Sequence, residues 1–280
     1  MSDAFAHCER LVKEADKDRF LATLFAPASR RPALCALYAF DIEIARVPTA
    51  ARQALAGEIR LQWWREVLEG QRMDEAAANP VAAALIETLD KYKLARASLM
   101  DVVEARTFDL YNDPFATTAE LEAYAERTKG AMMVSTAAVL GGADTDVKAI
   151  VRHAPMATAV CDILRSFASH VSRGHLRIPL DVLERHGAEP ADVLAGRSSN
   201  ELLASLANIR ELARKHFDAF KRLTPAVPAI SVPAFLPVAL VPLYFDRMEG
   251  KDYDPFRTIV AVPQWRRQWT LWRAARAWGA

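Results

Sequence analysis

The sequence is poor in cysteine, in glycine and in net charge, and each shortage excludes a class of protein. It has 3 cysteines and 10 glycines among 280 residues, and its formal net charge at pH 7 is +1. The cysteines show no Cys-x-x-Cys or Cys/His spacing, so we expect reduced, buried thiols rather than a disulfide framework or a zinc site. A net charge near zero gives no support for nucleic-acid binding, and we predict none.

Targeting and membrane-spanning features are also scarce. Residues 1–20 carry acids and lysines where a secretory signal needs an apolar stretch. No run is expected to reach the ~18 apolar residues of a membrane-spanning helix. We therefore expect a cytoplasmic protein, and any membrane contact is predicted to be peripheral, at the inner face of the membrane.

Apolar residues, by contrast, are plentiful and regularly spaced. They make up 52% of the chain and recur every three to four residues, as in helices with one buried face. Residues 131–140 (AMMVSTAAVL) are apolar on nearly all sides, which predicts a central buried helix. Strand signals are nearly absent, and no Gly/Ser-rich or charge-rich linker divides the chain. The sequence therefore predicts an all-α protein with a single domain over residues 1–280.

Two further segments give local expectations. Thr117 and Glu120 have the spacing of a capping box, so a helix is predicted to begin there. Proline is frequent over residues 225–242, and a short buried helix is expected only over residues 234–243.

The C-terminal segment 264–280 (QWRRQWTLWRAARAWGA) combines tryptophan with arginine and has no acid. As a helix it would place its tryptophans in one stripe, which suits an anionic membrane surface or a partner protein. The residues proposed for this surface are Trp265, Arg266, Trp269, Trp272 and Arg273. The alternative is that the stripe packs onto the protein and the arginines are solvated.

Several segments together resemble the squalene/phytoene synthase superfamily. They are DRFLATLFAP (18–27), RRPALCALYAFDIEIARV (30–47), IRLQWWREVLEG (59–70), NPVAAAL (79–85), TAELEAYAERTKGAMM (118–133) and ILRSFASHVSRGHLRIPLDVLERHG (163–187). The resemblance implies an isoprenoid-synthase-like helical bundle around a central cavity. In active members that cavity joins two isoprenoid diphosphates, whose charge is neutralised by Mg²⁺ on two aspartate-rich helices.

Both aspartate clusters of the family are missing from this chain. Ala45, Arg46 and Thr49 stand at the positions of the first cluster. On the second helix, Ser166 and His170 replace the two aspartates. Retained scaffold with lost aspartates resembles the branch that contains the mitochondrial respiratory complex I assembly factor and its bacterial relatives. The segments AFDIEIARV, RLQWWREVLEG, LEAYAERT and IPLDVLERHG carry that likeness.

The remaining candidates for the cavity or for a ligand each have a plainer alternative. Asp41 and Glu43 lie about 200° apart around a helix, so both cannot face the cavity in the same way. Trp64 and Arg65 could form a binding wall, but core packing with the arginine at the rim is favoured. A tyrosine on an apolar helix is usually a core residue. The candidates are Tyr38, Asp41, Glu43, Arg46, Trp64, Arg65, Asp162 and Arg165, with Asp162 and Arg165 expected to form an ion pair.

These observations predict a catalytically degenerate protein that supports complex I assembly. It is expected to bind either an isoprenoid-like lipid or a partner protein, which would be a complex I subunit or an assembly protein. No cofactor or metal is expected. The alternative is an active prenyl transferase that uses Mg²⁺ on Asp41, Glu43 and Asp162 in an unusual geometry. A third possibility is a plain interaction module with a filled interior, in which segment 264–280 is the functional surface.

Overall fold

The computed structural model describes residues 3–50, 53–142 and 144–279, except for the side chains of residues 144–146. Within these residues every regular element is a helix. The first half comprises α1 (Asp3–Ala15), α2 (Lys17–Thr23), α3 (Arg31–Ala50), α4 (Ala54–Glu69), α5 (Met73–Ala78), α6 (Pro80–Tyr92), α7 (Arg96–Arg106), η1 (Thr107–Leu110), α8 (Thr118–Ala125), the π-helical turn η2 (Glu126–Gly130) and α9 (Ala131–Leu140). The second half comprises α10 (Asp144–Val151), α11 (Ala154–Arg165), α12 (Phe167–Val171), α13 (Leu180–His186), α14 (Pro190–Leu194), α15 (Asn200–Leu223), η3 (Thr224–Ala226), η4 (Ala229–Ser231), α16 (Val232–Phe235), η5 (Leu236–Leu240), α17 (Val241–Met248) and α18 (Gln264–Trp278). The expectation of an all-α fold is confirmed.

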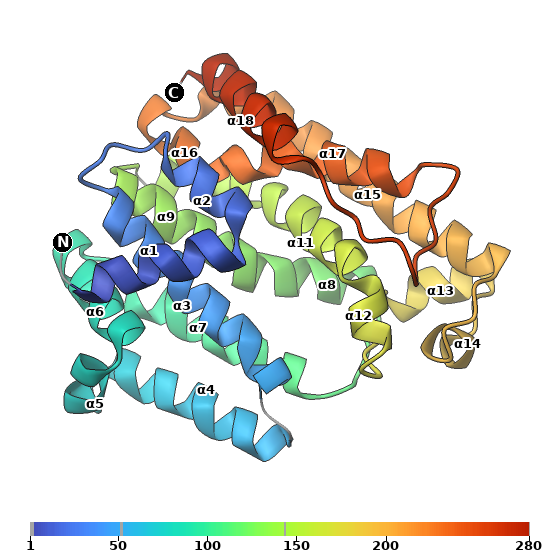
Figure 1. Ribbon diagram of the computed structural model, residues 1–280, viewed down its shortest axis with the longest axis horizontal. Coiled ribbons are helices and arrows are strands. Elements are labelled where there is room, and N and C mark those ends of the chain that lie inside the picture. Colours follow the sequence, from blue (N-terminus) through green and yellow to red (C-terminus); the bar gives the residue numbers. More distant parts are fainter. Residues whose placement is uncertain (1–2, 51–52, 143, 280) are drawn as a thin grey trace.

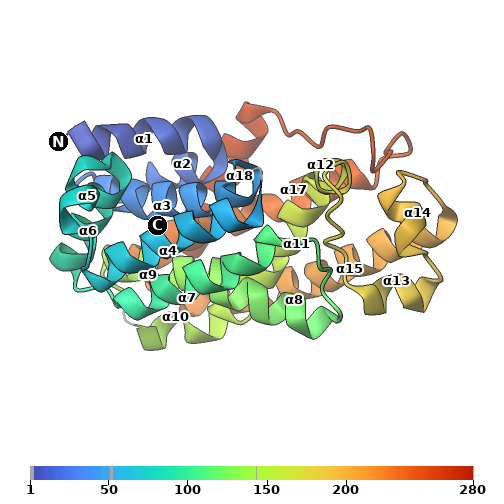
Figure 2. The same ribbon diagram turned by 90° about the horizontal axis from the view of Figure 1, so that it is seen from below.

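Helix α3 runs through the interior of the bundle. Its residues from Ala33 to Phe40 are all buried, and small alanines among them let neighbouring helices pack closely. Helices α1, α6 and α9 pack against it. Figure 2 shows α1 on one side of α3 and α7 on the other. The helix predicted over residues 131–140 is α9, with the same bounds, and it contributes to this core.

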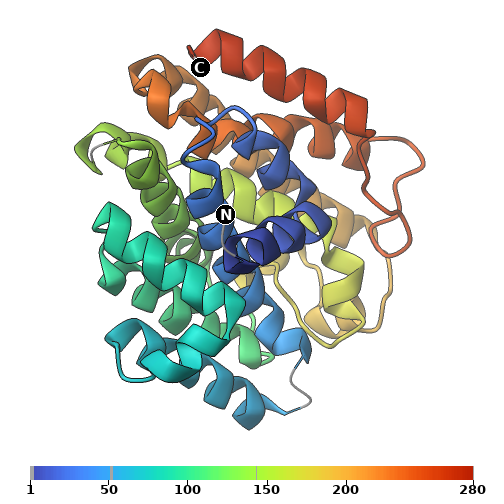
Figure 3. The same cartoon turned by 60° about the vertical axis from the view of Figure 1, so that its left-hand side comes forward.

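The second half of the chain completes the bundle around α11. The long amphipathic helix α15 packs along α11, and α17 contacts both. Helix α18 lies across η5, α16 and α2 and forms the edge of the molecule opposite to α4 (Figures 1 and 3). The segments that the resemblance assigns to the two aspartate-motif helices form α3 and α11, and residues of both line the cavity described below.

The expectation that no segment is long and apolar enough to span a membrane is wrong for one segment. An 18-residue window within residues Ala229–Met248 has a mean hydropathy of 1.6, but 67% of that window is buried inside the bundle. The expected single helix over 234–243 is also wrong, because the prolines divide the segment into η4, α16, η5 and α17. Its apolar composition is explained by packing under α18.

Candidate functional site

A cavity of about 930 Å³ opens between α2, α3, α11, α12, the coil of residues 256–260 and the first turn of α18. Its volume falls within the ~300–1,000 Å³ of small-molecule sites. A smaller pocket of about 100 Å³ adjoins it and shares its charged residues. Apolar and aromatic groups line this inner pocket, among them Tyr38, Met132, Met133 and Val241. The outer cavity is large enough for a ligand, and the inner pocket extends it toward the apolar core.

Positive charge predominates around the outer cavity. Ten Lys and Arg side chains line it against six Asp and Glu side chains. The cations are Lys17, Arg19, Arg46, Arg106, Lys129, Arg165, Arg173, Arg177, Arg257 and Arg267. A cavity with this excess attracts anions and repels divalent cations.

Helix α2 supplies the residues at the entrance to the inner pocket. Its N-cap Asp16 accepts a hydrogen bond from the backbone N–H of Arg19 at 2.9 Å and pairs with the Arg19 side chain. The same guanidinium reaches Asp41 of α3, with 2.7 Å between Nη1 and Oδ2. Arg106 of α7 approaches the other oxygen of Asp41 at 3.4 Å. Burial alone would raise the pKa of Asp41, but these positive charges hold the pKa well below its usual value.

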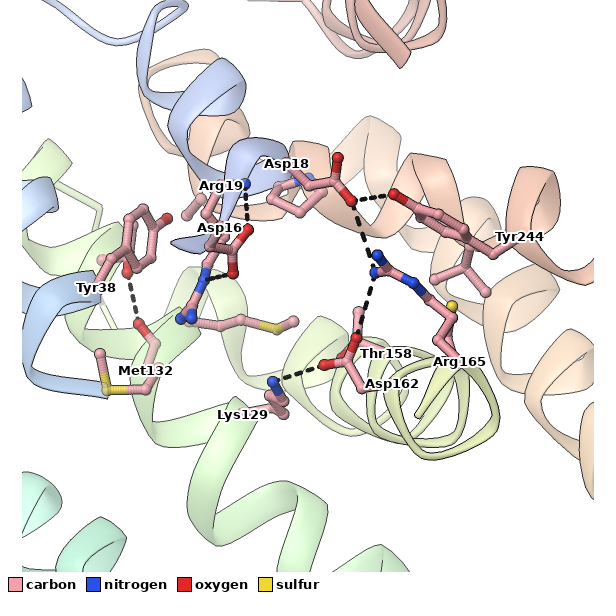
Figure 4. Close-up of a pocket in the computed structure, with 16 residues that line it drawn as sticks. Asp16, Asp18, Arg19, Tyr38, Lys129, Met132, Thr158, Asp162, Arg165 and Tyr244 are labelled. Carbon is pink, nitrogen blue, oxygen red and sulfur yellow. Dashed lines mark hydrogen bonds and ion pairs between the residues drawn. The ribbon is translucent and has the colours of Figure 1, made fainter. Parts of the chain in front are cut away.

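Asp18 stands among three donors from distant parts of the chain. Nη1 of Arg267 lies 2.9 Å from its Oδ1, Nη1 of Arg165 lies 3.7 Å from its Oδ2, and the hydroxyl of Tyr244 donates to Oδ2. The guanidinium of Arg165 also lies over the Tyr244 ring, 3.8 Å from its centroid. Figure 4 shows Asp18, Arg165 and Tyr244 converging at the pocket wall. An internal carboxylate therefore occupies the place where these donors could hold an external anion.

The π-helical turn η2 packs against α11 in the cavity wall. Nζ of Lys129 lies 2.8 Å from Oδ2 of Asp162, and Arg165 lies 3.7 Å from the other oxygen (Figure 4). The predicted ion pair between Asp162 and Arg165 is thus present. Burial would raise the pKa of Asp162, but Lys129 and Arg165 outweigh it and the pKa is lowered. Single π-helical turns inside helices often occur at functional sites.

A second cluster of charges lies at the far end of the cavity, around Asp109. Its carboxylate accepts hydrogen bonds from Arg106 at 3.1 Å and from the Tyr124 hydroxyl at 2.6 Å, and Arg177 lies at 3.3 Å. His170 lines the same end, and burial with the charges of Arg177 and Arg173 lowers its pKa to about 4. The histidine at this motif position is therefore neutral at pH 7.

The carboxylates present do not fit a magnesium cluster. Among the described residues, no group of three or more His, Cys, Asp or Glu side chains could hold a metal ion. Asp16, Asp18, Asp41 and Asp162 are each paired with Arg or Lys, so a cation would first have to displace those partners. The positions of the family's aspartates hold neutral or cationic residues, including Arg46 on the cavity wall.

The structure places five of the predicted candidates on the two cavities. Tyr38 lines the inner pocket, where burial raises its pKa to about 12. Asp41 and the exposed Arg46 line the outer cavity, and Asp162 and Arg165 line both.

The other three, Glu43, Trp64 and Arg65, lie outside both linings, which agrees with the plainer alternative stated above for each. Burial raises the pKa of Glu43, although the charges of His7, Arg60 and Arg46 oppose this. Trp64 is 4% exposed and packs edge-on against Phe40, with the ring centroids 5.1 Å apart. Arg65 forms an ion pair with Glu104 at 2.6 Å on the α4–α7 surface.

Sequence reasoning missed most of the ion-pair partners. They are Asp16, Asp18, Arg19, Arg106, Lys129, Arg177 and Arg267. Asp18 and Arg19 belong to the family-like segment 18–27, which was a usable signal. Arg267 belongs to the C-terminal segment, whose arginines the sequence leaves open to a membrane, a partner or solvent, but it pairs inward with Asp18.

Residues 12–273 match the squalene/phytoene synthase family. The chain belongs to that family. Mouse NADH dehydrogenase (ubiquinone) complex I, assembly factor 6 is 29% identical over 253 residues, covering 89% of this chain and 75% of the mouse protein. Phytoene synthase of Arthrospira platensis is 25% identical over 287 residues, covering 96% of this chain and 92% of that enzyme.

Solved structures of the squalene/phytoene synthase family share the fold. A dehydrosqualene synthase crystallised with a ligand superposes with a TM-score of 0.85 at 18% identity, covering 98% of this chain and 96% of that one. This likeness shows the isoprenoid-synthase-like helical fold that the sequence predicted. The resemblance to complex I assembly factors, also predicted, is confirmed by the mouse relative.

Proposed function

We propose that this squalene/phytoene synthase-family protein is non-catalytic, binds an isoprenoid-like lipid through its anionic head group, and supports the assembly of respiratory complex I. The observation that carries the proposal is the charge of the cavity. Where active members need clustered acids, the cavity has ten cations against six carboxylates. Arg46 and Arg173 are exposed on its wall, so a phosphate group can contact them directly.

The apolar part of the ligand is assigned to the inner pocket. Its wall includes Met132, Met133 and Val241, while Tyr38 and Arg165 stand at its charged side. At about 100 Å³ the pocket admits only part of a prenyl chain as it stands. The flexible methionines can change rotamer to enlarge it. The proposal includes no cofactor.

The link to complex I rests on relatives. The mouse protein is named as an assembly factor for complex I and aligns with 89% of this chain. We assign a complex I subunit or another assembly protein as the partner, and a peripheral position at the inner face of the membrane. Deleting the gene should reduce assembled complex I on a native gel, and the full-length protein should restore it. An unchanged amount of assembled complex I in the deletion strain would contradict this part of the proposal.

The experiment that tests the cavity uses farnesyl diphosphate, with Mg²⁺ or with EDTA, and measures both binding and pyrophosphate release. The proposal expects binding without metal and no turnover. Arg46→Gln should weaken binding, whereas Arg65→Gln, which lies outside the cavity, should not. Mg²⁺-dependent release that Asp162→Asn abolishes in a folded protein would instead establish the prenyl transferase alternative, which the 25% identity to a phytoene synthase favours. If the protein shows neither binding nor turnover, the remaining function is the plain interaction module.

A further inference from the structure

The outward face of α18 exposes three large aromatic side chains. Trp265, Trp269 and Trp272 are 66%, 54% and 41% exposed, and the rings of Trp269 and Trp272 stack with centroids 5.0 Å apart. Ile259, in the coil that leads to the helix, is 86% exposed. We call these four residues the tryptophan face. The alternative that the stripe packs onto the protein does not hold for these three tryptophans.

The opposite face of α18 fixes the helix to the bundle. Leu271 and Ala275 are buried, and Trp278 packs edge-on against Phe220 with the ring centroids 5.4 Å apart. Arg267 reaches inward to Asp18 in the cavity wall. These contacts fix the orientation of α18 on the bundle. Because Leu271, Ala275 and Trp278 face the bundle, the tryptophan face is turned to the outside.

The positive charge of α18 indicates which kind of surface could cover the tryptophan face. Arg266, Arg273 and Arg276 are exposed on the same helix, and no acid occurs between residues 264 and 280. The guanidinium of Arg276 lies 5.0 Å from the Trp272 ring centroid. A second copy of this chain would bring like charges together at such an interface. Tryptophan side chains flanked by arginines suit the head-group region of an anionic bilayer.

The mouth of the cavity adjoins this face. Residues 256–260 line the cavity, and the chain then runs directly into α18. Figures 1 and 3 show this coil and α18 following one another along the same side of the molecule. Arg257 and Ile259 belong to the cavity lining and also to that exposed edge.

We propose that the tryptophan face docks on an anionic lipid bilayer and thereby sets the mouth of the cavity against the membrane. This rests on the proposed function, because it describes how a lipid ligand reaches the cavity. Ile259 and the three tryptophans enter the head-group region. Arg266, Arg273 and Arg276 pair with lipid phosphates. A lipid then passes between bilayer and cavity beside residues 256–260 without crossing bulk water.

Vesicle binding of the full chain tests the docking. The protein should sediment with phosphatidylglycerol-containing vesicles and not with pure phosphatidylcholine vesicles. Arg273→Gln should lower the partition coefficient about fivefold, since one cation near an anionic surface contributes about 1 kcal/mol. Arg60→Gln, on the opposite edge in α4, should have no effect. Trp265→Ser with Trp269→Ser should weaken binding while circular dichroism and melting temperature stay unchanged.

The orientation is tested with an environment-sensitive fluorophore on a single introduced cysteine. The native cysteines are free and buried, as the sequence predicted, so labelling of the surface is selective. A probe at Ile259→Cys should shift to the blue on anionic vesicles, and one at Ile59→Cys, 62% exposed on α4, should not.

Equal shifts at both sites, no shift at residue 259, or no vesicle binding would overturn the proposal. Loss of tryptophan exposure through dimer formation in solution would do so as well. Binding of soluble farnesyl diphosphate without vesicles reports on the proposed function separately, so failure of docking alone leaves that function standing.

Discussion

Nη1 of Arg19 lies 2.7 Å from Oδ2 of Asp41, and together they join α2 to α3 in the wall of the cavity. Asp41 is 1% exposed, and Arg106 approaches its second oxygen. The Asp41 carboxylate therefore neutralises the charges of Arg19 and Arg106. The half-exposed Asp162 is likewise paired, with Lys129 and Arg165, so the acids on both α3 and α11 bind the protein's own cations.

Removing the charge of Asp41 should destabilise the fold strongly. Asp41→Asn leaves the buried cations Arg19 and Arg106 without their shared partner, and breaking a buried pair costs about 3–5 kcal/mol. Urea denaturation at pH 7 measures this loss. The matched variant Glu43→Gln should cost nothing measurable, because burial already raises the pKa of Glu43 and disfavours its charge. Equal effects from both variants would contradict the assigned role of Asp41.

Stability should fall on acidification, with His170 as one cause. The pKa of His170 is lowered to about 4 in the folded protein, whereas an unfolded histidine titrates near ~6.5. The unfolded chain therefore takes up the proton first. The contribution of neutral His170 is fully present above about pH 6.5 and is lost as the pH falls toward 4.

The comparison with His170→Gln isolates this contribution. Urea denaturation between about pH 7 and 4.5 should show a steeper decline for the wild type than for the variant. Asp41 contributes to the decline only below about pH 5, where the unfolded chain begins to take up a proton that the folded carboxylate, with its lowered pKa, does not bind. Identical slopes for wild type and variant would show that other groups carry the pH dependence.

Patterns along the chain were enough to predict individual helices. The all-round apolar stretch 131–140 forms α9, and residues 264–278 form α18, which ends at its left-handed cap Gly279. Thr117 caps α8 by accepting from the Glu120 N–H at 3.2 Å. Glu120, however, bonds the N–H of Ala116 rather than closing the capping box. Periodicity and capping depend on residues that are close together in the chain, so both can be read from a single sequence.

The charge pairing of the site could not be predicted in this way. Asp18 and Arg267 are 249 positions apart and meet only because α18 crosses α2. Which residues of α18 face inward depends on how Leu271 and Ala275 pack, and periodicity alone left both faces of the helix open. The loss of the aspartate clusters was readable from the family-like motifs. Their replacement by a network of arginine and lysine pairs depends on the tertiary structure.

Freeing the donors around Asp18 should create tighter anion binding. Asp18→Asn removes the internal carboxylate from Arg165 and Arg267, which then become available to pyrophosphate. Relief of one charge repulsion of about 1 kcal/mol predicts roughly a fivefold gain in affinity. Isothermal titration calorimetry with pyrophosphate in EDTA measures it. Asp90→Asn, which breaks a surface ion pair with Arg96, is the matched control. Unchanged or weaker binding would show that these donors do not form an anion site.

Trp64 offers a clean separation of packing from ligand binding. It is buried beside Phe40 and Trp63, with ring centroids 5.1 Å and 5.0 Å away. Trp64→Ala should therefore lower the free energy of unfolding by about 3–5 kcal/mol. Trp63 is only partly buried and its Nε1 donates to Glu75 on the surface, so Trp63→Ala should cost less. At temperatures where both variants remain folded, each should bind farnesyl diphosphate as the wild type does, because neither side chain lines the cavity. Weakened binding in a folded Trp64→Ala protein would place that tryptophan in a binding wall after all.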